Sequence, residues 1–340
     1  MECYQILCCG AFIMEYRRLQ MSKGGSFLLS LPKEWVKANG LTGGAILKLA
    51  AGEGGELTIK AESAAEIEAG MTAVIREGEG LERQIRANYL YGADTIVVEL
   101  GSRMTPDVRE EVNTSIHKLI GLEIVEEDAG SITVQSLLQP ASMPVKSTLR
   151  RAYTLAANMH REAERAFAHR DTELAGSIDR RDDEVDRLYF LMVRQLRLAL
   201  RKPSMTERLG IKPAECLELR MAAKYVETIA DYAGAVAASV PRLAGEDPGQ
   251  EAMDAITRLS GVAYRIHNNA AQALFRQDVK LSESVLAESR QLGQALAAVN
   301  ELITTRPPRL AALLDSIAIY FYQIGAQGID LAELVSGATV

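Results

Sequence analysis

Two pairs of carboxylates in the second half of the chain have a spacing that suggests chemistry. Asp182 and Asp186 lie four residues apart in SIDRRDDEVDRLYF, and Glu227 and Asp231 have the same spacing in ETIAD. Residues four apart share one face of a helix, where two like charges cost stability unless a partner neutralises them. Carboxylate pairs that face each other across a helical bundle commonly hold hard or borderline metal ions. These four residues are therefore candidate metal ligands.

The sequence around both pairs has the pattern of packed helices. The first pair lies in line with an apolar stripe at helical spacing, formed by Ile178, Val185, Tyr189, Val193 and Leu196. The second pair is accompanied on its side by small residues, namely Ala223, Ala230, Gly234 and Ala238. Small side chains would let another helix approach closely, so the two pairs could face each other.

The same acids could instead be ordinary surface ion pairs. The first pair is flanked by Arg180, Arg181 and Arg187, and the second follows Arg220 and Lys224. Exposed ion pairs contribute little to stability and need no ligand. The spacing alone leaves both interpretations open.

A tandem repeat of three helices would position these residues. The apolar period of 3.6 predicts three long helices from about 145 to 240 and three more from about 250 to 334. The breaks fall near Lys202-Pro203, Lys212-Pro213, residues 245–248 and residues 306–308. The final helices of the two repeats align, with Ile229 and Ile324 in equivalent places.

Histidine and cysteine add little to this candidate site. The four histidines, His117, His160, His169 and His267, are scattered singly, and each is expected to be a surface residue or an internally satisfied one. Three cysteines lie in the opening MECYQILCCGAFI, and Cys216 is isolated. The absence of a C-x-x-C pair argues against a zinc site or a disulfide framework and fits a reducing cytoplasm. Residues 1–13 are interpreted as an upstream extension, with Met14 as a possible start.

A small basic segment near the beginning contrasts with an acidic chain. The formal net charge of the whole chain is -7, yet residues 14–50 contain six basic residues against Glu15 and Glu34. The basic residues are Arg17, Arg18, Lys23, Lys33, Lys37 and Lys48. Such a segment suggests a polyanion-binding end, although a chance fluctuation of surface charge gives the same count.

The same segment predicts a β-hairpin, a helix and a second hairpin. A Gly pair separates two apolar stretches between residues 16 and 31, Pro32 suits the first position of a helix, and Gly40 suits its end. Strands at 45–49 and 57–60 form the second hairpin. About 45 residues bury too little apolar surface to fold alone, so a partner subunit is expected.

Residues 63–138 predict a compact α/β domain of the split type. Helices near 81–90 and 105–120 alternate with strands at 94–100, 123–127 and 131–135. This domain has no Gly-rich nucleotide loop and no nucleophile elbow, which favours a spacer or dimerisation role. No apolar run in the chain reaches the length of a membrane span, so the sequence predicts a soluble, cytoplasmic protein.

Two resemblances refine this outline. GGSFLLSLPKEW followed by ANGLTGGAILKL resembles the SpoVT/AbrB-like swapped-hairpin DNA-binding domain, which would cover residues 14–60. The resemblance implies an intertwined homodimer that presents basic strands and loops to DNA, with Arg17, Arg18, Lys23, Lys33 and Lys37 as the candidate contacts. Many members carry arginines after the proline where this chain has Lys33 and Lys37.

The second half resembles the PhoU domain, and the order of the parts is similar to that of archaeal phosphate uptake regulators. DDEVD at 182–186 and ETIAD at 227–231 match the acidic signatures of that repeat. The resemblance implies iron, zinc or similar ions at Asp182, Asp186, Glu227 and Asp231. In the second repeat Tyr322 and Ala326 replace the second pair, which leaves one site or a structural relic.

The expected fold is therefore an α+β multidomain chain. It comprises a swapped-hairpin domain (14–60), a small α/β domain (63–138) and two three-helix repeats (142–240 and 246–338). The leading hypothesis is a dimeric DNA-binding regulator of phosphate uptake. The alternative is an adaptor that negatively regulates a phosphate ABC transporter, or its signalling partner, at the inner face of the membrane without binding DNA. An enzyme that uses carboxylate-bound metal ranks lowest, because no general base accompanies the acids.

Overall fold

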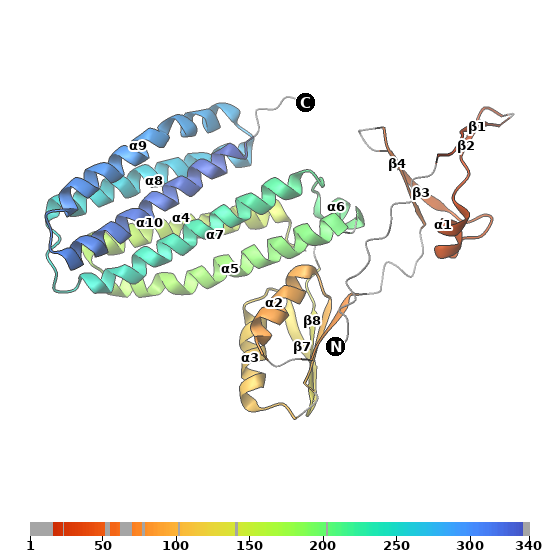
Figure 1. Ribbon diagram of the computed structural model, residues 1–340, viewed down its shortest axis with the longest axis horizontal. Helices are drawn as coiled ribbons and strands as arrows, with labels where there is room; N and C mark the ends of the chain where they lie inside the picture. Colours follow the sequence, from red (N-terminus) through yellow and green to blue (C-terminus); the bar gives the residue numbers. More distant parts are fainter. Residues whose placement is uncertain are drawn as a thin grey trace, which may run out of the picture. The chain divides into compact units, whose positions relative to one another are not determined.

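The computed structural model describes residues 16–22, 24–51, 55–61, 70–76, 79–100, 103–139, 142–201 and 203–335 (Figure 1). The chain divides into two compact units, Met1–Ala69 and Gly70–Val340. In the second unit, none of the described helices is long and apolar enough to cross a membrane. Lys23 and the opening cysteines lie outside the described residues.

The first unit consists of two antiparallel hairpins around a short helix. Strands β1 (Gln20–Met21) and β2 (Phe27–Leu28) pair with each other, as do β3 (Leu47–Ala51) and β4 (Leu57–Ala61). Helix α1 (Lys33–Ala38) follows directly after Pro32. The predicted order of hairpin, helix and hairpin is confirmed.

This unit has little apolar core of its own among the described residues. Helix α1 contains no buried residue. Large apolar side chains of both hairpins and their flanks are 45–98% exposed, namely Tyr16, Leu19, Met21, Phe27, Leu28, Leu29, Ile46, Leu49 and Leu57. Nine exposed apolar side chains on a short segment are typical of a surface that is covered by a partner. The swapped arrangement of the hairpins stays a prediction.

The second unit begins with an α/β module built on one four-stranded sheet. Its elements are β5 (Thr72–Ile75), α2 (Leu81–Tyr91), β6 (Thr95–Glu99), α3 (Pro106–His117), β7 (Leu122–Glu127) and β8 (Ser131–Ser136). The strand order is β5-β6-β8-β7, with β5 and β6 parallel and the other pairs antiparallel. The sequence predicted three of these strands and missed β5, because four residues with one buried side chain give too short a pattern.

Six long helices make up most of the rest of the second unit, in the two groups of three that the sequence predicted. The first repeat contains α4 (Val145–His169), α5 (Thr172–Arg201) and α7 (Glu215–Ser239), and the second contains α8 (Gln250–Arg276), α9 (Val279–Ile303) and α10 (Pro308–Glu333). Helix α5 ends at Arg201, at the predicted break, and a short helix that was not predicted, α6 (Pro203–Leu209), begins at Pro203, since proline is favoured at a first helical position. A 3₁₀ turn, Val240–Leu243, follows α7.

One apolar core runs through both repeats. It is rich in alanine, and the helices approach closely where alanine and glycine face each other. A Cβ placed on Gly328 of α10 would lie 2.6 Å from the Cα of His267 on α8. Because the core itself contains residues of both repeats, the two repeats pack as one body rather than as separate bundles.

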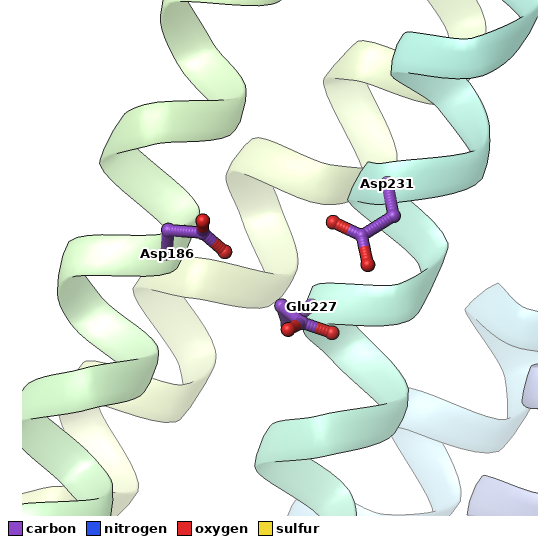
Figure 2. A group of neighbouring side chains, drawn as sticks. All are labelled: Asp186, Glu227 and Asp231. Carbon is purple, nitrogen blue, oxygen red and sulfur yellow. The ribbon is translucent and has the colours of Figure 1, made fainter. Parts of the chain in front are cut away.

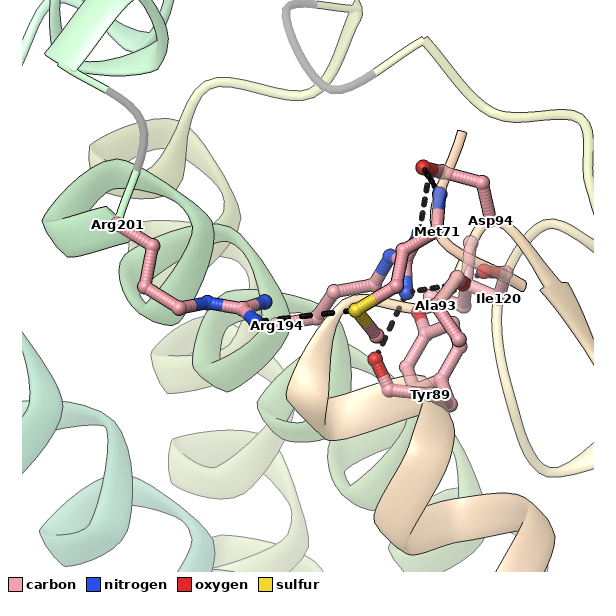
Figure 3. Close-up of polar contacts among 7 residues, drawn as sticks. All are labelled: Met71, Tyr89, Ala93, Asp94, Ile120, Arg194 and Arg201. Carbon is pink, nitrogen blue, oxygen red and sulfur yellow. Dashed lines mark hydrogen bonds and ion pairs between the residues drawn. The ribbon is translucent and has the colours of Figure 1, made fainter. Parts of the chain in front are cut away.

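The α/β module is fixed to α5 by a buried arginine (Figure 3). Arg194 is 5% exposed, and its Nη1 donates to the carbonyl oxygens of Tyr89 and Ala93, both at 2.8 Å. Its Nη2 lies 3.3 Å from Asp94 Oδ1, while Asp94 Oδ2 accepts the backbone N–H of Met71 at 2.9 Å. The guanidinium thus satisfies the C-terminal carbonyls of α2 and orders the start of the sheet.

A second arginine, Arg201, lies about two helical turns further along α5 and also contacts the α/β module. The Arg201 guanidinium lies 4.1 Å from the centroid of the Tyr91 ring and 3.9 Å from the sulfur of Met71. Gly92, with φ of 99°, ends α2 here, and a Cβ on it would lie 2.5 Å from Arg201 Nη2. Glycine is needed for both the backbone conformation and the space.

Candidate functional site

Three of the four predicted acids, Asp186, Glu227 and Asp231, converge between α5 and α7 (Figure 2). Carboxylate oxygens of Asp186, Glu227 and Asp231 all lie within 4.8 Å of one another. Glu227 is 9% exposed, whereas the Asp231 side chain is 45% exposed. We call these three residues the carboxylate cluster. It opens to solvent on the side of Asp231.

Asp182 lies next to the carboxylate cluster, one helical turn before Asp186. A Cβ placed on Gly234 of α7 would lie 3.8 Å from Asp182 Oδ2, so the carboxylate packs against this glycine. The negative charge of Asp182 also helps to raise the pKa of Asp231. The small residue predicted to allow close helix approach is thus where the fourth acid fits.

Burial and mutual repulsion make three ionised carboxylates in the cluster energetically unfavourable. Burial, followed by the charges of Glu227, Asp182 and Asp186, raises the pKa of Asp231 to about 7, against a partial opposing effect of Lys224. Burial and Glu227 likewise raise the pKa of Asp186. Either a proton or a cation would relieve this repulsion.

Lys224 supplies part of the missing positive charge. Its ammonium group hydrogen-bonds Glu227 Oε2 and lies 4.0 Å from Asp231 Oδ2. The Lys224 side chain is 46% exposed, so it reaches the cluster from the solvent side. The ion-pair interpretation of the sequence therefore holds for this one residue, at the same time as the acids converge.

Two of the flanking arginines contact other groups. Arg220 Nη2 donates to the hydroxyl of Tyr189 at 2.7 Å, and its guanidinium lies 4.9 Å from the Tyr189 ring centroid. Arg181 pairs with Glu162 on α4. The ion-pair interpretation required both arginines to pair with the cluster, and these contacts differ from that expectation.

The donor set fits a cation. Three carboxylates within 4.8 Å of one another can each place an oxygen about 2.0–2.5 Å from a common ion, as hard and borderline divalent cations require. Among the described residues this is the one group of three or more acidic, histidine or cysteine side chains with such spacing. In the second repeat Tyr322 and Ala326 stand in α10 at the places of the second pair, as the sequence indicated.

The candidate DNA contacts lie in the first unit. Arg17, Arg18, Lys33 and Lys37 are exposed, and the two lysines lie four residues apart on one face of α1. The fifth, Lys23, lies outside the described residues. These positions leave DNA contact a prediction.

The sequence analysis allowed for internally satisfied histidines but did not foresee that two of them would pair. His160 and His267, expected to be single, form a pair in the core: His160 Nδ1 lies 2.9 Å from His267 Nε2. His160 is on α4 and His267 on α8, 107 residues apart in the chain. Spacing along one helix gives no signal for a contact of this kind. His117 and His169 are exposed, as expected.

The helical body is similar to a known domain. Residues 149–240 match the PhoU domain model. This segment runs from within α4 to the end of α7 and contains all four candidate ligands. No curated protein matches the chain.

Two solved structures are similar to the chain. The crystal structure of PhoU from Pseudomonas aeruginosa superposes with a TM-score of 0.51 at 20% identity, covering 57% of this chain and 95% of that one. The phosphate transport system regulatory protein PhoU from Streptococcus pneumoniae gives 0.47 at 15% identity, covering 56% and 91%. The first likeness shows that the PhoU domain and this chain share the helical fold.

Proposed function

We propose that this protein regulates phosphate transport without catalysing a reaction, by binding a partner protein through its helical body. The observation that carries the proposal is the PhoU domain match over residues 149–240 on a body with the fold of a PhoU structure. The partner would be a phosphate ABC transporter, or its signalling protein, at the inner face of the membrane.

The carboxylate cluster would serve this function as a metal site. Asp186, Glu227 and Asp231, with Asp182 beside them, would hold iron, zinc or a similar ion. A bound cation would cancel the repulsion that raises the pKa values of Asp186 and Asp231. It would also cross-link α5 to α7, so metal occupancy would set how firmly these helices are held together.

Four segments would share three tasks. Residues 63–138 would space the first unit from the body, and residues 142–240 and 246–338 would form the partner-binding body. Residues 14–60 would dimerise the chain. The apolar side chains that the first unit exposes support dimerisation, because a second copy would bury them.

A second candidate function is transcription regulation through DNA binding by the first unit. The exposed cations Arg17, Arg18, Lys33 and Lys37 favour it, since a dimer would present each of them twice. The comparisons match the helical body, so the adaptor is the better supported of the two.

One experiment in cells separates the two functions. Phosphate uptake would be measured in a strain that lacks this protein and is complemented with the full chain or with Gly70–Val340 alone. The adaptor function predicts that Gly70–Val340 restores the restraint on uptake. Loss of that restraint, with the fragment present at the level of the full chain, would favour the DNA-binding function.

A second experiment tests DNA contact directly. Each cation that meets a phosphate releases counterions, so the logarithm of affinity should fall with the logarithm of salt by about 0.9 per contact on duplex DNA. Arg17→Ala with Arg18→Ala should flatten that slope, while Asp182→Asn should leave it unchanged. Absence of DNA binding by the wild-type chain even at low salt would refute the second function.

A further inference from the structure

A continuous chain of hydrogen bonds crosses the core between the two repeats. The Tyr153 hydroxyl lies 3.0 Å from His267 Nδ1, and His267 Nε2 lies 2.9 Å from His160 Nδ1. His160 Nε2 lies 2.9 Å from Ser260 Oγ, and Ser260 donates to Glu164 Oε2 at 2.8 Å. Tyr153, His160 and Glu164 are on α4, while Ser260 and His267 are on α8, so all four steps pass between the repeats.

When Glu164 is ionised, the donor and acceptor of every hydrogen bond in this network are fixed. An ionised Glu164 can only accept, so the Ser260 hydroxyl donates to it and must accept from His160 Nε2–H. Neutral His160 then has a lone pair at Nδ1, which accepts from His267 Nε2–H. Neutral His267 in turn accepts at Nδ1 from the Tyr153 hydroxyl. Both imidazoles are thus the Nε2–H tautomer, and each donor has one acceptor.

We propose that Tyr153, His267, His160, Ser260 and Glu164 form a one-proton relay that joins the two repeats and reverses its direction when Glu164 is protonated. In the reversed state Glu164 donates to Ser260, Ser260 donates to His160 Nε2, and His160 Nδ1–H donates to His267 Nε2. His267 Nδ1–H then donates to the Tyr153 oxygen. The two states differ by one proton, which resides on Glu164, and both imidazoles become the Nδ1–H tautomer.

The surroundings of Tyr153 provide the contact that the reversed state needs. In that state Tyr153 must direct its hydroxyl proton away from His267 Nδ1. Asn268 Oδ1 and the carbonyl oxygen of His267 both lie 3.4 Å from the Tyr153 oxygen and can accept it. Protonation of Glu164 therefore changes the hydrogen bonding of Tyr153 near Asn268, at the other end of the relay.

The core favours neutral imidazoles over a buried imidazolium. Burial lowers the pKa of His160 to about 3 and holds the pKa of His267 well below its usual range, with the neighbouring His160 adding to the effect. Burial also raises the pKa of Tyr153, which keeps the hydroxyl protonated. A relay that reverses lets the site take up a proton without placing a charge on either ring.

Other groups from α4, α8 and α10 surround the relay. From α4, the Arg161 guanidinium lies 5.4 Å from the Tyr264 ring, which belongs to α8 and lies edge-on to both imidazoles. Arg150, also on α4, stacks on Phe275, which packs against Tyr153. From α10, the apolar Phe321 ring lies 5.4 Å from that of His160. Both arginines are thus one aromatic ring away from the relay.

Histidine tautomers measured by NMR test the relay on the full chain labelled with ¹⁵N-histidine. His117→Gln and His169→Gln, at exposed positions, leave the two core rings as the observed signals. At about pH 8 both should be Nε2–H. Glu164→Lys, which can only donate, should convert both to Nδ1–H, whereas the matched charge change Glu301→Lys on the exposed face of α9 should not.

A pH titration of the wild-type chain gives an independent measurement if Glu164→Lys does not fold. Both rings should change from Nε2–H to Nδ1–H together, with one midpoint and without the signature of an imidazolium. Separate midpoints, charging of either ring before the chain unfolds, or unchanged tautomers on protonation of Glu164 would each overturn the proposal.

Discussion

Replacing Asp231 by Asn should stabilise the metal-free protein above about pH 7. In the folded chain the pKa of Asp231 is about 7, compared with an ordinary value of 3.8. Between these values the folded protein keeps a proton that the unfolded chain releases, so raising the pH costs folded stability. Above about pH 7 the full cost is present, because Asp231 is then ionised beside Glu227 and Asp182. Asparagine removes the charge and nearly keeps the shape.

The size of the effect follows from the two pKa values and the exposure of the side chain. The rise from 3.8 to about 7 corresponds to about 4 kcal/mol at 1.36 kcal/mol per pH unit. The Asp231 side chain is 45% exposed, so solvent screening reduces the expected gain to about 1–2 kcal/mol. Near pH 4 the variant and the wild type should have similar stability.

Urea unfolding in a chelating buffer at about pH 4 and pH 8 measures the difference. Asp315→Asn, at an exposed carboxylate of α10, is the matched control and should change stability little at either pH. An equal effect of Asp231→Asn at both pH values, or destabilisation at pH 8, would refute the account of the cluster.

Adding metal should make the wild type more stable than Asp231→Asn, the reverse of their order without metal. A ligand that binds only the folded state at about 100 times its dissociation constant stabilises by about 2.7 kcal/mol. Excess zinc or ferric iron should therefore stabilise the wild type more than Asp231→Asn, which has lost one carboxylate ligand. Equal responses, with no ion bound to either protein by elemental analysis, would refute the metal site and leave the pH prediction standing.

Three further predictions concern packing and oligomeric state. Arg194→Met should speed hydrogen exchange in α2 and cost about 2–4 kcal/mol, since the carbonyl of Tyr89 loses a buried charged donor. Gly328→Ala should cost about 1–3 kcal/mol, because its Cβ meets the backbone of α8, while Gly293→Ala, with open space around it, should be neutral or stabilising in urea unfolding. Sedimentation should show a dimer for the full chain and a monomer for Gly70–Val340.

The helices and the convergence of the acids could be predicted because their signals are local. A stripe of apolar residues at helical spacing fixes which face of α5 is buried, and Asp186 lies beside that stripe. Gly234 in α7 marks where another helix approaches. Two such faces on consecutive helices of one bundle tend to meet, so the prediction needed no knowledge of contacts between distant residues.

What the sequence did not reveal depends on contacts across the chain. Arg194 reads as a charged residue in an apolar stretch of α5, and its partners lie about 100 residues earlier. The sequence around His160 and around His267 gives no sign that the two side chains meet. Lys224 could be read as a cluster partner or as a surface ion pair, because the choice depends on where α5 places Asp186.

Helix α5 connects these features physically. Its first half carries Asp182 and Asp186, and Arg194 lies eight residues, or about 12 Å, further along the same helix. The α/β module also approaches the acids directly, because the charge of Arg86 on α2 lowers the pKa of Asp186 while the Arg86 guanidinium lies 5.6 Å from the Phe190 ring. A cation bound at the cluster would therefore repel Arg86 as well as Lys224. Metal occupancy should then alter hydrogen exchange in α2, and an unchanged exchange rate on metal binding would show that the module does not respond to the site.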